Sequence, residues 1–361
     1  MRSRSMPKLD SPLQLSPVFK PKIWGRDNLA PIFTRPKPAA LPRPSGNELI
    51  GEVWITDDES RFMNGPIAGM TLAKASEEYG PELYGTNWRG RRFPLLAKYI
   101  YTSDWLSVQV HPDDAQARRL DPGHRGKCEM WYIVSSGRKG ELLLGVKPGV
   151  DRETLRSSFE HGTSRQHLNR FHPKAGEAIF IPPGTVHALG PDLVLFEVEE
   201  NSDLTYRLDD FGRIGLDGKP RPLHLEKGMA VARLDLPPRR QLPIVKLSEP
   251  YGARRFVAAC SFFALEEFTL LKPRPFTGRP EAVEVLSVLE GEGRVETATG
   301  WMGFHPGDTW LIPPATPHYR LAPRTKTRWL KFYVPDLDRD FRQPLAKRGV
   351  PASRIGRIVF D

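Results

Sequence analysis

The sequence has few cysteines and no long apolar run. Its 361 residues include two cysteines, Cys128 and Cys260, and neither stands in a CxxC or Cys/His spacing. We therefore expect neither a disulfide framework nor a thiolate metal site. The apolar runs are far shorter than the roughly 18 residues of a membrane helix, and the start MRSRSMPKLD lacks the apolar core of a signal peptide. These absences predict a cytoplasmic protein without membrane partners.

Acidic residues are outnumbered by basic ones, and the formal net charge is +10. Such an excess suits an anionic partner, which can be nucleic acid, an acidic membrane surface or a phosphorylated metabolite. The basic residues near the C-terminus are scattered among prolines and apolar residues, without the interleaved aromatics that single-stranded nucleic acid binders use. The scatter favours an ordinary solvated surface, so we do not expect nucleic acid binding.

Proline and glycine are abundant, with 36 and 31 residues, and they mostly separate short apolar runs. This pattern favours many short strands joined by turns. Residues 151–162 differ: Asp151 is suited to cap a helix, and Gly162 to end it. The sequence thus predicts an all-β fold with a short helical insert near 151–170. The first series of expected strands comprises residues 48–56, 93–102, 105–111, 128–134, 141–146, 177–182 and 194–200.

One unit of the sequence occurs twice. Residues 171–189 read FHPKAGEAIFIPPGTVHAL and residues 304–321 read FHPGDTWLIPPATPHYRL, which places His187 and His318 at equivalent points. A second strand series accompanies the second copy, and two such units predict two jelly-roll β-barrels in tandem. The strands of this series are expected within residues 254–270, 282–298, 308–314 and 328–334.

This repeat divides the chain into five expected parts. We expect a loose N-terminal arm at 1–20, a catalytic unit at 21–235 and a proline-rich linker, LPPRRQLP, at 236–243. A second, degenerate unit follows at 244–340, and a C-terminal tail at 341–361.

The first unit contains a candidate metal site. Strand alternation places Gln109 and His111 of LSVQVHPDD on one face, and Lys127 and Glu129 of GKCEMWYIV on another shared face. His187 follows the turn IPPGT. Taken singly, such a histidine is more often a turn or core residue, and such a glutamate more often faces solvent. Together Gln109, His111, Glu129 and His187 offer two nitrogens and two oxygens, a set suited to zinc, manganese, iron or cobalt.

These motifs resemble a known family. Residues 176–187 match the second cupin motif, G-xxxxx-P-x-G-xx-H, although Pro191 stands where the motif ends in Asn. QVHPDD and GKCEMWYI resemble motifs of the type I phosphomannose isomerases, which are cupin proteins. The resemblance covers about residues 20–340 and is closest to the short bacterial form. Further similar segments follow in the same order: KIWG (22–25), GEVW (51–54), FPLLAK (93–98) and NSDLTYR (201–207).

The resemblance implies an activity and the residues that carry it. Its members interconvert mannose 6-phosphate and fructose 6-phosphate through an enediolate, and one zinc ion per chain would be held by the four residues named above. Arg207 would be the active-site arginine, with Lys127 and Lys98 as further contacts. Glu197 and Asp203 would orient Arg207 or transfer the proton. The identity of the base stays open.

The resemblance also implies a substrate site, and two other functions remain as alternatives. Trp24 and Ser107, with Lys127 and Arg207, are expected to contact the sugar phosphate. Two alternatives keep the fold: a non-enzymatic sugar-binding bicupin, and a bicupin dioxygenase. Dioxygenases of this type use three histidines and one glutamate, so the glutamine at 109 counts against the second. The sequence does not distinguish a monomer from a homodimer.

The second unit is expected to have lost its site. With Gly137 placed over Gly291, Glu129 aligns with Val283, and Glu284 would be one residue out of register and face away from the interior. The segment SFFALEEF (261–268), where a Q-x-H would stand, contains no histidine. His318 would therefore be isolated, and one imidazole does not hold a metal ion.

Substitution of the two equivalent histidines tests this asymmetry. We expect His187→Ala, like Gln109→Leu, to lose bound metal and activity together, because each removes a ligand. His318→Ala should leave both nearly intact. Metal analysis of the purified variants, beside an assay with mannose 6-phosphate, measures both properties. Loss of metal from His318→Ala would contradict the prediction.

Overall fold

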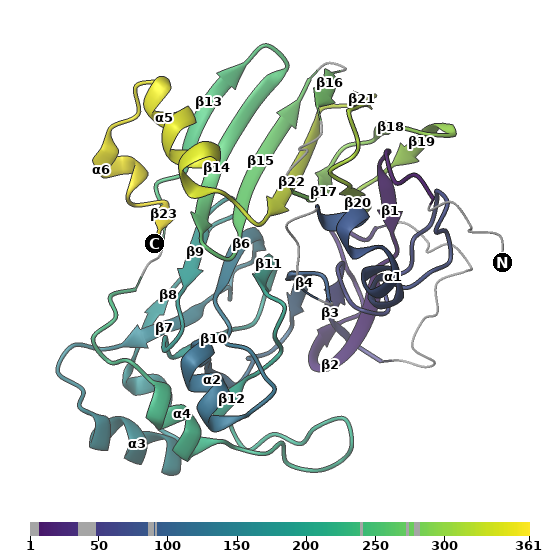
Figure 1. Cartoon of the computed structure of the whole chain (residues 1–361). Coiled ribbons are helices and arrows are strands. Elements are labelled where there is room, and N and C mark those ends of the chain that lie inside the picture. The colour runs from purple at the N-terminus through teal and green to yellow at the C-terminus, as the bar shows by residue number, and fades with distance from the viewer. Residues whose placement is uncertain are drawn as a thin grey trace.

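The computed structural model describes residues 7–34, 48–85, 90, 92–238, 241–271, 274–277 and 282–361. The described chain is mostly β, as predicted, and forms four sheets whose strand pairs are antiparallel except for one short parallel pair (Figure 1). None of its helices is long and apolar enough to span a membrane.

Two sheets come from the first part of the chain. All seven strands expected there are formed, with their ends shifted by a few residues. The six-stranded sheet contains, in order, β2 (Val18–Arg26), β3 (Ile50–Trp54), β4 (Leu95–Thr102), β11 (Leu193–Glu200), β6 (Glu129–Ser136) and β9 (Ala178–Ile181). The five-stranded sheet contains β12 (Tyr206–Asp209), β5 (Val108–Val110), β10 (His187–Leu189), β7 (Leu142–Val146) and β8 (Leu168–Phe171).

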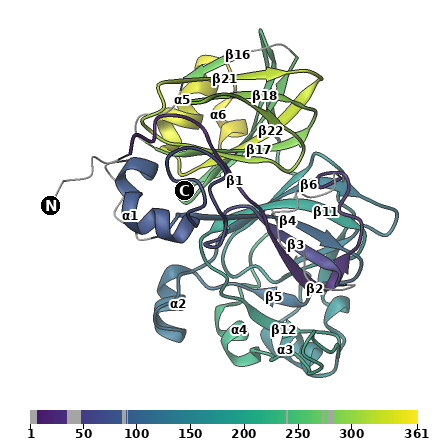
Figure 2. The same ribbon diagram turned by 90° about the vertical axis from the view of Figure 1, so that its right-hand side faces the viewer.

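The other two sheets come mainly from the C-terminal part, which occupies a separate half of the molecule (Figure 2). The eight-stranded sheet contains β1 (Leu13–Leu15), β20 (Thr309–Ile312), β17 (Glu284–Glu290), β22 (Thr327–Tyr333), β15 (Ala264–Leu270), β14 (Gly252–Cys260) and β13 (Val245–Glu249), with β23 (Val359–Phe360) beside β14. The four-stranded sheet contains β16 (Arg274–Thr277), β21 (His318–Pro323), β18 (Gly293–Thr297) and β19 (Gly300–Phe304).

The expected helix within 151–162 is confirmed. It is α3 (Arg152–Glu160), where the Asp151 side chain accepts a hydrogen bond from the backbone N–H of Thr154 and Leu155 and Phe159 are buried. The remaining helices were not predicted, because they are short or interrupted. They are α1 (Leu72–Tyr84), α2 (Asp114–Leu120), α4 (Leu225–Val231), α5 (Gln343–Lys347) and α6 (Ala352–Ile355).

The six-stranded sheet is buried on both faces. On one face Phe196 packs against Phe332 of β22, with ring centroids 5.5 Å apart, and the Tyr99 hydroxyl lies 2.7 Å from that of Ser287. The opposite face carries Ile100 and Trp131 into a core shared with the five-stranded sheet. Double burial explains why strands such as β4 and β6 are nearly continuous apolar runs. Charged residues are rare in strands that are buried on both faces, so those in β4 and β6 need a specific explanation.

The expectation of a loose N-terminal arm is wrong, and the C-terminal tail contains regular structure. Residues 13–15 are not part of a loose arm, since they form β1 and pair with Leu311, Trp310 and Thr309 of β20. The tail after residue 340 contains α5, α6 and β23, and β23 pairs with Ala259 and Cys260. Both segments are too short to show a strand pattern, and only their distant partners make them regular.

The expected register of the second unit is also wrong. Glu284 lies opposite Ile312, just as Glu129 lies opposite Ile181, and both isoleucines begin an I-P-P turn. Each strand has a register shift about five residues after its glutamate. The strand that begins at the glutamate has eight residues in the first unit and seven in the second, so aligning the turn glycines misplaced Glu284. Its side chain is 3% exposed and lies in the interior.

A buried ion-pair cluster surrounds Glu266 of β15. Its carboxylate lies 3.2 Å from Lys331 Nζ, accepts a 2.8 Å hydrogen bond from the Tyr333 hydroxyl, and is bound by Arg254. Burial raises the pKa of Glu266, but Lys331 and Arg254 outweigh it and bring the pKa from the ordinary 4.5 to about 2. Because the folded pKa is lower than the unfolded one, this stabilisation is complete above about pH 4.5 and disappears as the pH falls to 2.

Glu266→Gln should therefore lower the free energy of unfolding at pH 7 by about 3 kcal/mol. The difference from the parent protein should shrink between pH 4.5 and pH 2. Urea unfolding at several pH values measures it. As a control, Glu296→Gln removes a surface pair with Arg320 and should cost less than about 1 kcal/mol. Equal losses for the two variants would contradict the prediction.

Candidate metal centre

Strand register places one row of candidate residues on the five-stranded sheet. His187 on β10 lies opposite Gln109 on β5, and Gln109 lies opposite Arg207 on β12. Residues directly opposite each other in antiparallel strands have side chains on the same face. The three expected site residues are therefore neighbours, although 98 positions separate the first from the last.

The facing six-stranded sheet supplies a second row. Glu129, the first residue of β6, lies opposite Glu199 on β11, and Glu197 lies opposite Lys98 on β4. Alternation puts these charged side chains on the face that also carries Trp131. A cluster of charged side chains thus occupies one part of an otherwise apolar interior.

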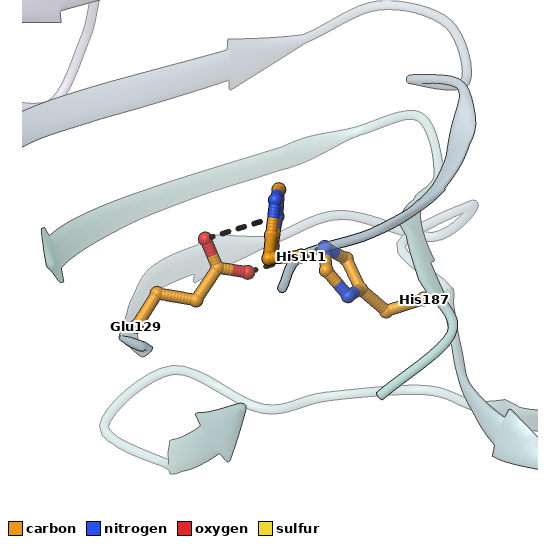
Figure 3. A group of neighbouring side chains, drawn as sticks. All are labelled: His111, Glu129 and His187. Atoms are coloured by element: carbon orange, nitrogen blue, oxygen red, sulfur yellow. Dashed lines mark ion pairs between the residues drawn. The ribbon is translucent and has the colours of Figure 1, made fainter. Parts of the chain in front are cut away.

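Two histidines and a glutamate converge between these sheets (Figure 3). Glu129 Oε1 lies 3.1 Å from His187 Nε2, and Glu129 Oε2 lies 3.6 Å from His111 Nε2. None of the three side chains is more than 1% exposed. The Gln109 amide nitrogen lies 3.1 Å from His187 Nε2. An amide is nearly symmetric in shape, so rotation by 180° brings its oxygen to the same place. The four expected ligands are therefore brought together.

Backbone carbonyls orient both imidazoles. His111 Nδ1 lies 3.0 Å from the Leu204 carbonyl oxygen, and His187 Nδ1 lies 2.9 Å from that of Thr185. A carbonyl can only accept, so each Nδ1 carries the proton and each Nε2 directs a lone pair inward. Burial lowers the pKa of His187 to about 4, and burial together with Lys127 lowers that of His111. Both rings are therefore neutral near pH 7, the form that binds metals.

The inward-facing atoms fit a cation. Within the described chain, His111 Nε2 and both carboxylate oxygens of Glu129 are buried without a hydrogen-bond partner of suitable geometry. Leaving several acceptors buried and facing one another costs free energy. A divalent ion removes this cost by accepting their lone pairs. Two imidazole nitrogens with carboxylate and amide oxygens form a borderline donor set that suits zinc.

Two buried lysines lie beside this centre. Lys98 Nζ is 2.9 Å from Glu197 Oε1, and Lys127 Nζ is 2.7 Å from Glu199 Oε2 and 3.3 Å from Glu129 Oε2. Burial lowers the pKa of each lysine, but the neighbouring carboxylates outweigh it and raise both pKa values. Both side chains are therefore charged, and they direct their ammonium groups inward rather than toward solvent.

Arg207 has an unused hydrogen-bonding group. Its NH1 donates to the Pro222 carbonyl oxygen at 2.9 Å, whereas its buried Nε has no partner among the described residues. The neighbouring Arg213 and Arg221 are bound to Asp210 at 2.7 and 2.8 Å. Burial and then Arg221 lower the pKa of Arg207 from its very high ordinary value. Arg207 thus supplies a cation that is not neutralised by a direct ion pair.

The expected orienters of Arg207 do not contact it in the described structure. Glu197 Oε2 accepts a 2.8 Å hydrogen bond from Trp131 Nε1, and Glu197 Oε1 pairs with Lys98. Asp203 raises the pKa of Lys98 and of Arg207 but forms no hydrogen bond with either in the described part of the chain. Asp203 therefore influences Arg207 through its electric field.

The two expected sugar contacts, Trp24 and Ser107, are both buried. The Arg221 guanidinium lies 5.0 Å from the Trp24 ring centroid, which joins Trp24 to the arginine cluster. No hydrogen bond or ion pair described in the structure joins either residue to the four candidate ligands. Their substrate contacts remain a prediction.

A cavity of about 760 Å³ adjoins the cluster. Its lining includes Leu204, which orients His111, and Trp54, whose ring centroid lies 5.3 Å from Lys98 Nζ. Asp203 and Arg125 also line it. This volume is within the range of small-molecule sites.

Glu199 and Arg221 were not predicted from the sequence. Glu199 had a signal, since alternation in VLFEVEE places it on the face of Glu197. Arg221 lies in an irregular loop, where no periodicity indicates which way a side chain points.

The fold and this centre together define a cupin-like protein with a buried cluster suited to a divalent metal ion. The model of the phosphomannose isomerase type I catalytic domain matches residues 13–146. The chain is 32% identical over 321 residues to the mannose-6-phosphate isomerase ManA of Bacillus subtilis, covering 86% of this chain and 95% of that protein. It is 32% identical over 311 residues to the mannose-6-phosphate isomerase of Streptococcus mutans, covering 84% and 92%.

Solved structures agree with these relatives. The crystal structure of the Bacillus subtilis mannose 6-phosphate isomerase superposes with a TM-score of 0.80 at 28% identity, over 89% of this chain and 99% of that one. A zinc-bound mannose 6-phosphate isomerase has the same fold, with a TM-score of 0.68 at 16% identity over 90% and 99%. The chain belongs to the type I phosphomannose isomerase family.

Proposed function

We propose that this protein interconverts mannose 6-phosphate and fructose 6-phosphate and holds one zinc ion with Gln109, His111, Glu129 and His187. The observation that carries the proposal is the convergence of buried, unpartnered acceptors at His111 and Glu129 beside His187. The names of the relatives support the substrate, and the zinc-bound neighbour supports the metal. The donor set also admits manganese, iron or cobalt.

The reaction moves a proton between C1 and C2 of the open-chain sugar, and negative charge develops on the sugar oxygens. A metal ion at this site would supply a Lewis acid that stabilises this charge. Lys127 and Lys98 add positive potential from behind Glu129, in a dry interior where charges interact strongly. Arg207 is suited to hold the phosphate or the developing oxyanion through its free Nε.

Two carboxylates are candidates for the proton transfer. Burial raises the pKa of Glu197, but Lys98 and Lys127 lower it well below its ordinary value, so Glu197 is ionised. Its oxygens are engaged by Lys98 and Trp131. Asp203 instead lines the cavity, where a substrate can reach it. We assign the transfer to one of these two.

We further propose that residues 21–235 form the catalytic cupin barrel and residues 244–340 a second barrel that has lost its site, with the linker at 236–243. The equivalent places of Glu129 and Glu284 support a tandem repeat. In the second half Lys331 Nζ lies 3.0 Å from Glu284, and His318 is exposed. Both groups of metal-binding side chains found in the described chain lie in the first half. We expect the protein to act in the cytoplasm.

The exchange of the C2 hydrogen tests the activity. Metal-loaded protein incubated with mannose 6-phosphate in deuterated water should form fructose 6-phosphate that carries deuterium at C1, and mannose 6-phosphate re-formed in the reverse direction should carry deuterium at C2, as followed by NMR. A chelator should abolish conversion and added zinc should restore it. Binding of the sugar by metal-loaded protein without exchange would refute the isomerase proposal and favour a sugar-binding bicupin.

Arg207→Ala should retain bound metal and lose turnover. Removing one donor to a developing oxyanion lowers kcat by roughly 10²- to 10³-fold. Arg156→Ala is a matched control. Arg156 lies on α3, where it pairs with the exposed Glu226 of α4, and it is not among the candidate site residues. Steady-state kinetics and metal content of both variants measure the effect. Unchanged turnover in Arg207→Ala would remove its assigned role.

A further inference from the structure

Lys127 is a potential competitor of the metal ion. Its ammonium nitrogen lies 3.3 Å from Oε2 of Glu129, the same oxygen that faces His111 at 3.6 Å. A lysine ammonium and a divalent ion are both attracted to a buried carboxylate. If Lys127 bound Glu129 fully, it would neutralise the carboxylate that the metal requires. A second acceptor must therefore compete with Glu129 for this ammonium.

Glu199 is placed to do so. It lies on β11 directly opposite Glu129 on β6, and its side chain is fully buried. Its Oε2 is 2.7 Å from Lys127 Nζ, which is 0.6 Å shorter than the distance from that nitrogen to Glu129. Its Oε1 accepts a 3.1 Å hydrogen bond from Lys98 Nζ. One carboxylate thus bridges both buried lysines.

Glu199 is not grouped with the two histidines among the closely spaced donor atoms of the described residues. His111 and His187 group with Glu129, whereas Glu199 groups with Glu129 and Glu197. Glu129 is the residue common to the two clusters. Glu129 therefore joins the cluster that contains the two imidazoles to the cluster of carboxylates that binds the lysines.

We infer that Glu199 is a positioning residue that holds the Lys127 ammonium behind Glu129 and so leaves the Glu129 carboxylate open to a divalent cation between the histidines. The inference rests on the proposed metal site. The residue does not touch the metal or the substrate, and it acts through Lys127. Outer-shell partners of this kind typically change metal affinity by 10- to 100-fold.

Zinc affinity, measured by competition with a chromophoric chelator, tests the inference. Glu199→Met keeps the length of the side chain and removes both acceptors, so Lys127 turns to Glu129 and the zinc Kd should rise by roughly 10- to 100-fold. Lys127→Met/Glu199→Met should bind zinc within about twofold of Lys127→Met, because the competing ammonium is gone. A double variant as weak as Glu199→Met would overturn the inference, since a merely structural role of Glu199 does not depend on Lys127.

Two further variants test whether a loss of zinc affinity in Glu199→Met comes from unfolding. Glu266→Met removes an equally buried carboxylate that also pairs with a lysine, but in the other half of the molecule. It should lose stability and keep the zinc affinity of the parent. Glu199→Gln keeps the shape of the side chain and one acceptor oxygen, and its affinity should lie between those of the parent and Glu199→Met.

The outcomes separate this inference from the function on which it rests. Failure of the parent protein to bind zinc overturns both. Tight binding by the parent and equal binding by a folded Glu199→Gln or Glu199→Met overturns the role of Glu199 alone. An equal loss of affinity in Glu266→Met and Glu199→Met also overturns it, because the effect would then follow general stability.

Discussion

The structure depends on one carboxylate that is buried without adequate hydrogen bonds. Glu129 faces two imidazole nitrogens whose protons are held elsewhere, by the carbonyl oxygens of Leu204 and Thr185. Neither ring can donate to it, and the arrangement is unfavourable without a cation. A divalent ion at this place would accept the lone pairs of these groups and would remove the unfavourable interaction.

Glu129 and Glu284 occupy equivalent strand positions in the two halves, but their charged neighbours differ. In the first half the lysine nearest to Glu129 is drawn toward Glu199, so the carboxylate stays open. In the second half Lys331 lies 3.0 Å from Glu284 and is shared with Glu266. There the nearest cation is a lysine side chain. The surroundings of the two glutamates therefore differ in the placement of acids and lysines, and the second glutamate has no buried histidine pair beside it in the described structure.

Packing between the halves connects the site to the whole molecule. The sheet that carries Glu129 and Lys98 on one face presents Tyr99 and Phe196 on the other, against β17 and β22 of the second half. Side chains on a twice-buried sheet have few alternative positions. The second half thus packs against the sheet that carries Glu129 and Lys98, and it contributes none of the four candidate ligands.

The sequence by itself determined the strands, the helix at 151–162 and the four candidate ligands, because alternation and turn residues are local signals. It did not determine the register of Glu284, which depends on a one-residue difference in the length of the strand. Nor did it determine that residues 13–15 pair with β20, since three residues contain no periodicity. Only the tertiary structure decided that Glu199 binds Lys127 and Lys98, because ion pairing between strands depends on which strands become neighbours.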